Sequence, residues 1–435
     1  MAAALGVLVS CGSVKSGEEV VAASRDSKVV VAYVTSWSEV MPDPQYMTHI
    51  NYAFGHVNES FNGVKIDNEE RLRQIVDLRK QKPELKVLLS IGGWGSGRFS
   101  EMAANDEYRR AFAADCDRVV KEFALDGIDI DWEYPTSSMA NISSSPDDTE
   151  NFTLLMQDIR AAIGNEKELT LATVASARYI DFKAILPSVD FVNIMAYDMA
   201  SAPKHHSALY PSGHSGDITS DGAVTAHLKA GVPPSKLVMG MPFYGRGGDG
   251  YPSFQDYNKV GNTDTQYTEK WDEVAQVPYL ADKNDTLVFG FENPRSLAIK
   301  CQYILDKDLL GGMYWDYSGD NEQGDLRRTV AENLLGKPHK GEGTGVDGTW
   351  WTARRIYRCR LEVLAPKCKR EFQYYRDKQC QEHNGGLLVA VQLGYSIGFP
   401  ALYLAEGSGR CIRQVYRRRP WRLDRFPSCY FAGRV

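Results

Sequence analysis

Three carboxylates occupy alternate positions in residues 126–133, which read DGIDIDWE. Because side chains alternate along a β-strand, Asp129, Asp131 and Glu133 would share one face, with the intervening Ile and Trp side chains on the other. At a spacing of ~6.7 Å and an effective dielectric constant near ~20, each like-charged pair costs about 2.5 kcal/mol, nearly two pKa units. At least one carboxyl should therefore keep a proton near neutral pH. Glu133 is outermost on the strand, so the pattern predicts a general acid.

The elements that must position this strand alternate along residues 29–336. Short β-branched or apolar runs are followed by longer amphipathic segments, which is typical of strand-helix units around a parallel sheet. Eight such units predict an α/β fold, the (β/α)8 TIM barrel, and an open doubly wound sheet is the competing architecture. No glycine-rich phosphate loop follows a strand. We expect strands at residues 29–37, 49–56, 86–94, 127–133, 169–175, 191–197, 237–244 and 312–317, and helices at about 68–81, 100–124, 148–163, 179–186, 219–230, 294–309 and 321–335.

The carboxyl ends of the strands carry the active site in such a barrel, so the residues there are the candidates. Their side chains are mainly aromatic or acidic, which indicates a sugar-binding cleft, because pyranose faces stack on Trp and Tyr while hydroxyls bond to carboxylates. A salt-bridged barrel floor or a hard-cation site would explain the carboxylates but not the aromatic residues. Beyond the carboxylates, these candidates are Tyr33, Phe54, Trp94, Met195, Tyr197, Asp198, Tyr244, Arg246 and Trp315.

Several candidates have a structural alternative. Trp94, Phe54 and Tyr33 can serve packing instead of contacting a ligand. The adjacent His205 and His206 invite a metal interpretation, but without carboxylate partners in the sequence they are weak ligands. We therefore expect a loop in the cleft wall there, with no metal and no cofactor.

The DGIDIDWE segment resembles the DxxDxDxE signature of family 18 glycoside hydrolases, the chitinase family. Three further motifs match that family in order along the chain. SIGG at residues 90–93 is similar to its SxGG motif, MAYD at 195–198 to its strand-six motif, and Trp315 stands where the family keeps the floor of its -1 subsite. The resemblance spans residues 29–336.

This resemblance implies a retaining hydrolysis of β-1,4 linkages between N-acetylglucosamine units, in which the 2-acetamido carbonyl of the substrate attacks the anomeric carbon. Glu133 would protonate the leaving oxygen and then deprotonate water. Asp131 would orient the acetamide, Asp129 would share its proton, and Tyr197 would hydrogen-bond the acetamide oxygen. The resemblance places around the sugar Asp198, Trp315, Met195, Tyr244 and Arg246.

Other members of the family leave alternatives open. Residues 132–135, WEYP, look more like the chitinase branch than the endo-β-N-acetylglucosaminidase branch, which cuts the chitobiose core of N-glycans. A non-catalytic chitin-binding lectin on the same barrel typically lacks the terminal acid, which is present here as Glu133. Many members also insert a small α+β domain between strands seven and eight. Only about 47 residues, 247–293, are available for it, so we expect it to be absent or reduced, with an open cleft and endo-acting cleavage.

The N-terminal segment, residues 1–28, reads as a signal and linker. LVSC at residues 8–11 resembles the lipobox of a bacterial lipoprotein, which implies cleavage before Cys11 and lipidation of its thiol. No Lys or Arg precedes Cys11, which departs from such signals. We expect an exported lipoprotein at the cell envelope, otherwise a secreted protein, with membrane contact only through this anchor; a disordered N-terminal tail is the alternative.

The composition changes abruptly after Gly336. The 435 residues are 43% hydrophobic and 24% charged, which is typical of a folded chain, and their net charge is -6. Residues 337–435, however, hold 19 Lys or Arg against 8 Asp or Glu and five of the eight cysteines. We interpret this basic tail as a segment without an evolved fold, such as a frameshift product, with a carbohydrate-binding accessory domain as the alternative. A nucleic-acid arm fits poorly with an exported enzyme, so no nucleic acid partner is expected.

The remaining cysteines are too few for a disulfide framework in the main body. Cys116 and Cys301 also lack the spacing of metal ligands. Reduced, buried or modified thiols are therefore expected.

Overall fold

A computed structural model describes residues 28–248, 251–260 and 267–336, together with the backbone of five strands between residues 356 and 414. The chain divides into two units, one containing the main body and the other containing these five strands. Cys11 and the predicted signal segment lie outside the described residues.

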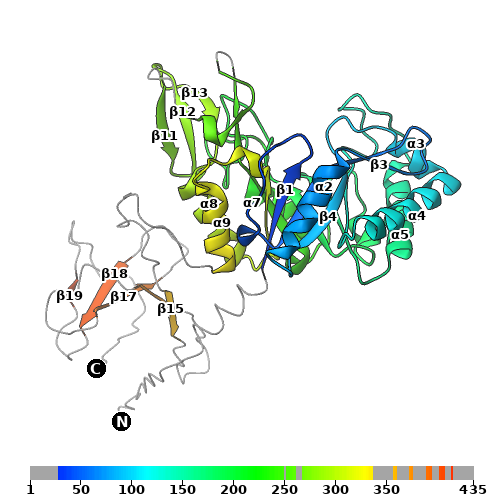
Figure 1. Ribbon diagram of the computed structural model, residues 1–435. Helices are drawn as coiled ribbons and strands as arrows, with labels where there is room; N and C mark the ends of the chain where they lie inside the picture. Colours follow the sequence, from blue (N-terminus) through cyan, green and yellow to red (C-terminus); the bar gives the residue numbers. More distant parts are fainter. Residues whose placement is uncertain are drawn as a thin grey trace, which may run out of the picture. The chain divides into compact units, whose positions relative to one another are not determined.

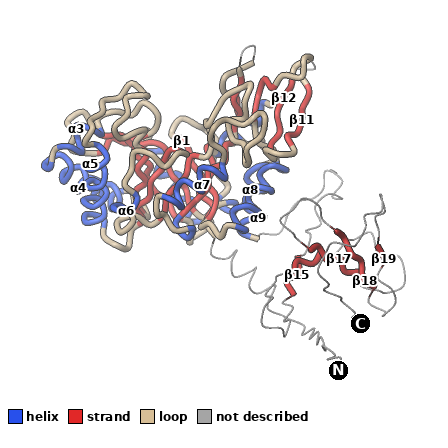
Figure 2. The backbone as a smooth tube through the Cα atoms, turned by 180° about the vertical axis from the view of Figure 1, so that it is seen from behind, coloured by secondary structure: helices blue, strands red, loops and turns tan. Residues whose placement is uncertain are grey.

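The main body is a closed barrel of eight parallel strands surrounded by helices, seen from opposite sides in Figures 1 and 2. The strands follow the order β1-β14-β8-β7-β6-β5-β4-β2, and pairing of β1 with β2 closes the ring. The predicted TIM barrel is therefore confirmed. A ninth strand, β3 (Val64–Ile66), pairs antiparallel with β2. The barrel strands are β1 (Val29–Thr35), β2 (His49–Val57), β4 (Lys86–Gly92), β5 (Gly127–Asp131), β6 (Glu168–Val174), β7 (Phe191–Met195), β8 (Leu237–Pro242) and β14 (Gly311–Trp315).

The helices pack their apolar faces on the outside of the barrel. The segment expected to be one helix at residues 100–124 is instead two helices that meet at Asn105. Asn105 has extended backbone angles, and its side-chain oxygen accepts hydrogen bonds from the backbone N–H groups of Glu107 and Tyr108, so it caps the second helix and ends the first. The α-helices are α2 (Glu69–Val76), α3 (Phe99–Ala104), α4 (Asp106–Glu122), α5 (Asp148–Ile163), α6 (Phe182–Ile185), α7 (Ser220–Lys229), α8 (Pro294–Asp306) and α9 (Asp325–Leu335).

Short 3-10 turns complete the helical structure of the main body. They lie at η1 (Pro44–Tyr46), η2 (Asp77–Lys80), η3 (Pro234–Lys236), η4 (Tyr257–Lys259) and η5 (Tyr317–Gly319).

The barrel interior is not uniformly apolar. Val31, Met313 and their neighbours form a small apolar cluster inside the ring. Beside it lies a layer of buried polar side chains contributed by β2, β4, β5, β6 and β7, all 0% exposed: Asn51, Ser90, Asp129, Thr170 and Asn193. Because buried polar groups need partners, this layer predicts a hydrogen-bonded site inside the barrel.

An insertion between β8 and α8 forms a separate antiparallel sheet, labelled β11 to β13 in Figure 1. Leu280, Phe289 and Phe291 give it a small apolar core of its own. The described part of the insertion has one helical turn, η4, so the inserted domain is present in reduced form. Its strands are β9 (Tyr244–Gly247), β10 (Gln255–Asp256), β11 (Thr268–Asp272), β12 (Val277–Ala281) and β13 (Leu287–Gly290).

The second unit contains an antiparallel sheet of five short strands in sequential order. The sequence pattern predicts little sustained strand periodicity there, whereas these strands do pair. They are β15 (Ile356–Cys359), β16 (Phe372–Tyr375), β17 (Leu388–Leu393), β18 (Ala401–Glu406) and β19 (Arg413–Gln414).

Two further observations bear on the cysteines and on membranes. Cys116 and Cys301 are buried free thiols, in agreement with expectation. Within the described residues, no helix combines the length and apolar character needed to cross a bilayer.

Candidate active site

β5 carries the first two carboxylates on its inward face. Asp129 and Asp131 are 0% and 4% exposed. Ser90 of β4 and Thr170 of β6 lie opposite Asp129 in the parallel register, and Gly92 lies opposite Asp131. Gly92 has φ +130°, and a Cβ added there would lie 2.0 Å from the Asp131 carbonyl oxygen. Glycine therefore allows β4 to run this close to the strand that carries the carboxylates.

Asp129 accepts hydrogen bonds from side chains on four other strands. One carboxylate oxygen accepts from the Tyr33 and Ser90 hydroxyls, each at 2.8 Å. The other accepts from the Thr170 hydroxyl at 2.6 Å and the Asn193 amide at 3.3 Å. Burial raises the pKa of Asp129, and these four hydrogen bonds counteract part of that rise. Tyr33, a predicted cleft residue, is thus a 1% exposed partner of Asp129.

Asp131 has an unusual electrostatic position. Burial and then the neighbouring carboxylates Glu133 and Asp129 raise its pKa well above the usual range. Within the described residues its Oδ1 is buried and receives no hydrogen bond. Such an oxygen is an acceptor that a bound ligand can satisfy.

Glu133 lies two residues beyond the end of β5. Burial raises its pKa to about 7; a hydrogen bond with Tyr134 lowers the pKa and the charge of Asp198 raises it. This value agrees with the expectation that one of the three carboxyl groups keeps a proton near neutral pH. The group is poised to donate a proton and to take one back at that pH.

Tyr197 and Asp198 follow β7, which ends at Met195 instead of at the predicted residue 197. Tyr197 fits because position 240 is glycine: a Cβ there would lie 2.9 Å from the Tyr197 ring. Within the described residues the Tyr197 hydroxyl donates a hydrogen bond only to the weak acceptor Met313 Sδ, at 3.8 Å. Burial, followed by the charge of Asp131, raises the pKa of Tyr197, so it stays a protonated donor.

Asp198 is held by a cation from the insertion. Arg246 on β9 donates two hydrogen bonds to its carboxylate, at 2.7 and 2.6 Å, and His206 lies 3.5 Å away. Burial raises the pKa of Asp198, but the bonds from Arg246 and His206 outweigh burial and hold the pKa below its usual range. Asp198 therefore stays charged beside Glu133.

Aromatic side chains line the space around these groups. Trp315, at the end of β14, stacks on Phe54 with ring centroids 5.6 Å apart and lies 5.6 Å from Tyr33. Trp37, which is 65% exposed, extends this wall outward, 6.3 Å from Phe54 and 6.5 Å from Trp315. Met195, 9% exposed, belongs to the apolar cluster that includes Tyr33 and Phe54.

A second aromatic group follows β4 and β5. Trp94 is 61% exposed and meets Tyr134 edge-on at 6.4 Å, and Tyr134 stacks on Tyr179 at 5.5 Å. The exposure of Trp94 favours ligand contact over packing.

The insertion adds a third aromatic group. Phe254 stacks on Tyr244 at 4.6 Å, and the Arg246 guanidinium lies 5.3 Å from each ring. Tyr244 also meets Tyr197 edge-on at 6.1 Å. Tyr244 and Arg246 therefore lie beside the catalytic candidates.

Sequence reasoning missed Trp37, Tyr134 and Phe254 among these residues. Trp37 and Tyr134 lie two and three residues beyond the ends of β1 and β5, so the strand-end rule could have found them. Phe254 reaches the site from the insertion, for which the sequence carries no periodic signal. His206 lies in the loop that the sequence places in the cleft wall, and it contacts Asp198.

The two adjacent histidines have separate partners. His205 lies 3.2 Å from Asp272, and burial lowers its pKa to about 4. His206 contacts Asp198. Among the residues with described side chains, no group of three or more His, Cys, Asp or Glu residues is arranged to hold a metal ion.

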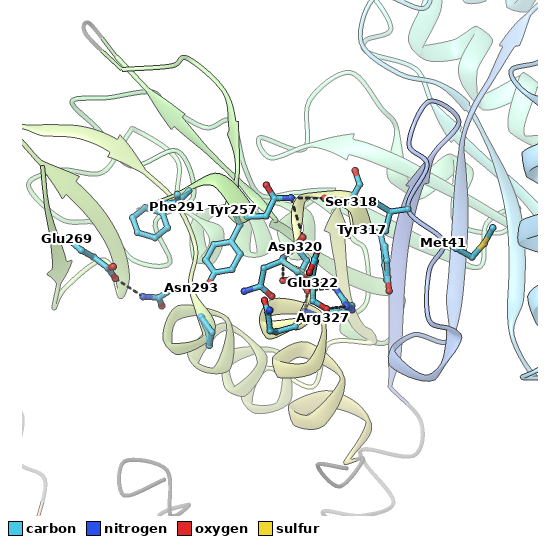
Figure 3. A pocket seen from close by; sticks show the side chains of 16 residues that line it. Met41, Tyr257, Glu269, Phe291, Asn293, Tyr317, Ser318, Asp320, Glu322 and Arg327 are labelled. Atoms are coloured by element: carbon cyan, nitrogen blue, oxygen red, sulfur yellow. Dashed lines mark hydrogen bonds and ion pairs between the residues drawn. The ribbon is translucent and has the colours of Figure 1, made fainter. Parts of the chain in front are cut away.

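A separate cavity of about 990 Å³ lies between the insertion, the loop after β1 and the start of α9 (Figure 3). Its polar side chains are largely paired with one another: Arg327 with Asp320 at 3.1 Å, and Asn293 with Glu269 at 3.2 Å. None of the three carboxylates lines it. The chemistry therefore belongs to the barrel mouth and not to this cavity.

Comparison with known proteins agrees with this geometry. The family model of glycosyl hydrolases family 18 matches residues 29–320. Chitinase A1 of Niallia circulans is 30% identical over 409 residues, covering 69% of this chain and 58% of that protein. Chitotriosidase-1 of Mus musculus is 31% identical over 350 residues, covering 68% and 74%. The chain thus spans less than two thirds of the length of the Niallia protein.

Solved structures give the same assignment. A family 18 N-acetylglucosaminidase from Paenibacillus barengoltzii superimposes with a TM-score of 0.66 at 32% identity, covering 71% of this chain and all of that one. A Group IV chitinase from Ostrinia furnacalis gives 0.65 at 28% identity, with coverage of 71% and 100%. The four sequence motifs, the barrel and these matches agree, and the chain belongs to glycosyl hydrolases family 18.

Proposed function

We propose that this chain hydrolyses β-1,4 linkages between N-acetylglucosamine units in chitin or chitooligosaccharides. The observation that carries the proposal is Glu133, with a pKa raised to about 7, beside buried Asp131 in an aromatic-lined barrel mouth. The names of the relatives, chitinase and chitotriosidase, support the same substrate class.

In the first step Glu133 donates its proton to the leaving glycosidic oxygen. The carbonyl oxygen of the substrate's 2-acetamido group attacks the anomeric carbon as the bond to the leaving group breaks, which gives an oxazolinium ion. In the second step the Glu133 carboxylate takes a proton from water as the water oxygen attacks the same carbon. The bond between that carbon and the acetamide oxygen breaks, which restores the acetamide. The configuration at that carbon is retained.

Asp131 and Tyr197 position the acetamide in this mechanism. Asp131 Oδ1, buried without a partner among the described residues, accepts the acetamide N–H, and the Tyr197 hydroxyl donates to the acetamide oxygen. The negative charge of Asp131 then stabilises the developing cation more than the neutral substrate. Asp129, which its four hydrogen bonds hold in place, shares or takes up the proton of Asp131.

The remaining side chains hold the sugar. Trp315 stacks beneath the sugar at the scissile bond, and Asp198 with Arg246 bonds to its hydroxyls. Trp94 and Trp37, exposed on the loops after β4 and β1, provide platforms for sugars further along the chain. Phe54, Met195 and Tyr244 complete the wall.

Two modes of cleavage are distinguishable. We expect endo-acting cleavage, because the insertion is reduced to a small sheet and leaves the cleft more open. The second candidate is an N-acetylglucosaminidase activity. The similarity to an N-acetylglucosaminidase of the same family supports it.

The test is hydrolysis of chitohexaose and of an N-glycan core by the full chain, with products resolved by size and anomeric form. Trimers and tetramers with β-configuration at the earliest times are expected. Monomer or dimer alone would favour release from a chain end, cleavage of the N-glycan alone would favour the endo-β-N-acetylglucosaminidase, and binding without turnover would indicate a lectin. Glu133→Gln should lower kcat by about 10² to 10⁴-fold.

For localisation we propose export and lipid anchoring on Cys11. The resemblance of residues 8–11 to a lipobox supports it. Metabolic labelling with a fatty acid, compared between the natural chain and Cys11→Ala, tests this proposal; equal labelling of both chains would exclude Cys11 as the anchor.

A further inference from the structure

The loop after β1 presents three exposed apolar side chains. Trp37, Val40 and Met41 are 65%, 48% and 45% exposed. An exposed indole binds a sugar face well only if it is held in place, because ordering it on binding costs free energy. The backbone that carries Trp37 therefore needs support.

Arg71, in the first turn of α2, supplies that support. It is 6% exposed, its Nε donates to the Thr35 carbonyl at 3.0 Å, and an Nη donates to the Val40 carbonyl at 2.8 Å. One rigid guanidinium thus joins the two ends of the loop that contains Trp37.

Asn68 strengthens the same attachment. Its side-chain oxygen accepts from the Arg71 backbone N–H at 3.3 Å, which caps α2, and its amide donates to the Ser36 carbonyl at 3.1 Å. Three carbonyls flanking Trp37 therefore accept hydrogen bonds from the start of one helix.

The charge of Arg71 is costly where it lies. Within the described residues none of the ion pairs involves Arg71, and burial lowers the pKa of its guanidinium. A buried cation without a carboxylate contributes little to stability compared with an apolar side chain of similar size. Its distinctive contribution is the fixed geometry of the loop.

We propose that Arg71 is a positioning residue that fixes the Trp37 platform and thereby sets how tightly long chitooligosaccharides bind. The inference rests on the proposed function, because it assigns Trp37 to a sugar distant from the scissile bond. Short substrates that do not reach Trp37 are bound independently of Arg71.

The test measures the Kd of chitohexaose and of chitobiose by calorimetry on the full chain carrying Glu133→Gln, so that no hydrolysis occurs. Arg71→Met should raise the Kd of the hexamer about tenfold and that of the dimer less than about twofold. Trp37→Ala should show the same pattern, and the double variant should be no weaker than Trp37→Ala alone. Arg71→Lys, which can reach one carbonyl at a time, should be intermediate.

Arg79→Met is the matched control. Arg79 lies in η2, directly after α2, and also donates to backbone carbonyls, those of Leu85 at 3.2 Å and Ala124 at 2.6 Å. Unlike Arg71, it also pairs with a carboxylate, that of Asp126. Its loss should affect stability but not the ratio of the two Kd values. Equal weakening of both ligands by Arg71→Met, or additive effects of Arg71→Met and Trp37→Ala, would overturn the proposal.

Hydrogen exchange provides a readout that needs no ligand. Arg71→Met should speed exchange of the amides at residues 36–41, and Arg79→Met should not. If the chain bound no chitooligosaccharide, the proposed function would fail, while exchange would still decide whether Arg71 fixes the loop; unchanged exchange would overturn the inference.

Discussion

Glu133 couples the pH dependence of catalysis to its neighbours. Its protonated form is required for the first step, so kcat/KM should fall about tenfold per pH unit above the pKa of about 7. Because the charge of Asp198 raises that pKa, Asp198→Asn should move the alkaline limb to lower pH, by up to about one unit. Initial rates on a soluble oligosaccharide between pH 5 and 9 would show the shift.

The control for this prediction is Asp285→Asn, an exposed carboxylate in the insertion that pairs with Lys270. Its profile should match that of the unaltered protein. An alkaline limb that stays in place in Asp198→Asn, or moves upward, would contradict the electrostatic coupling.

Glu133 also affects stability. Its folded-state pKa, about 7, lies above the ordinary value of 4.5, so its contribution to stability is fully present below about pH 4 and is lost as pH rises through about 7. Glu133→Gln removes this cost and should stabilise the fold by roughly 2 kcal/mol at pH 8, with little effect at pH 4.

Urea unfolding of both proteins at the two pH values measures this difference. If Glu133→Gln is no more stable than the unaltered protein at pH 8, the charged Glu133 carboxylate does not destabilise the fold.

The site residues that can be predicted from the sequence are those that lie within a contiguous motif. Asp129, Asp131 and Glu133 are recognisable because strand alternation alone puts them on one face. Trp37 could be found only by extending the strand-end rule to β1. Phe254 could be found only from the folded chain, because no periodic pattern marks its position in the insertion. The loop that carries His206 is expected in the cleft wall, but its contact with Asp198 follows only from the folded chain.

At the scale of elements, a buried ion pair joins three segments behind the site. Lys300 of α8 donates to Glu292, which follows β13, and to the carbonyl and hydroxyl of Ser207 at 2.5 and 2.6 Å. Ser207 follows His206, the partner of Asp198, and its hydroxyl donates to the Ala196 carbonyl at 3.3 Å. The insertion, α8 and the loop after β7 are therefore tied together.

Lys300→Met should destabilise the protein by about 3–5 kcal/mol, because it leaves the Glu292 carboxylate buried without its cation. The double variant Lys300→Met/Glu292→Leu should recover most of that loss. Chemical unfolding of the three proteins measures both effects. A double variant that is no more stable than the single one would show that the unpaired Glu292 carboxylate does not cause the loss.

Element types follow from periodicity, whereas their ends do not. The apolar pattern of residues 100–124 is continuous across Asn105, and only the cap geometry reveals the break between α3 and α4. The strands predicted at residues 127–133 and 191–197 end two residues early. The last two residues of each prediction lie beyond the hydrogen-bonded strand and carry side chains of the site.

At the scale of the molecule, eight repeats of strand and helix predict the barrel, because so many parallel strands with covering helices close most readily into a ring. The form of the insertion was not predictable beyond its length, since its antiparallel pairing depends on contacts between β9 and β13 across the inserted chain.

The barrel should function without the basic tail. All carboxylates and aromatic residues of the site lie between residues 33 and 315. A chain truncated after Gly336 is expected to keep its kcat/KM on chitohexaose within about twofold. A truncated chain that folds by circular dichroism but loses turnover would show that residues 337–435 contribute to catalysis.

The hydrogen bonds around Asp129 have a consequence for heat inactivation. Their donors come from β1, β4, β6 and β7, so the carboxylate keeps its full set of partners only while strands around much of the ring stay in register. Partial opening on almost any side would leave this buried group short of donors. Loss of activity on heating should thus coincide with melting of the whole barrel, with no inactive but folded species preceding it.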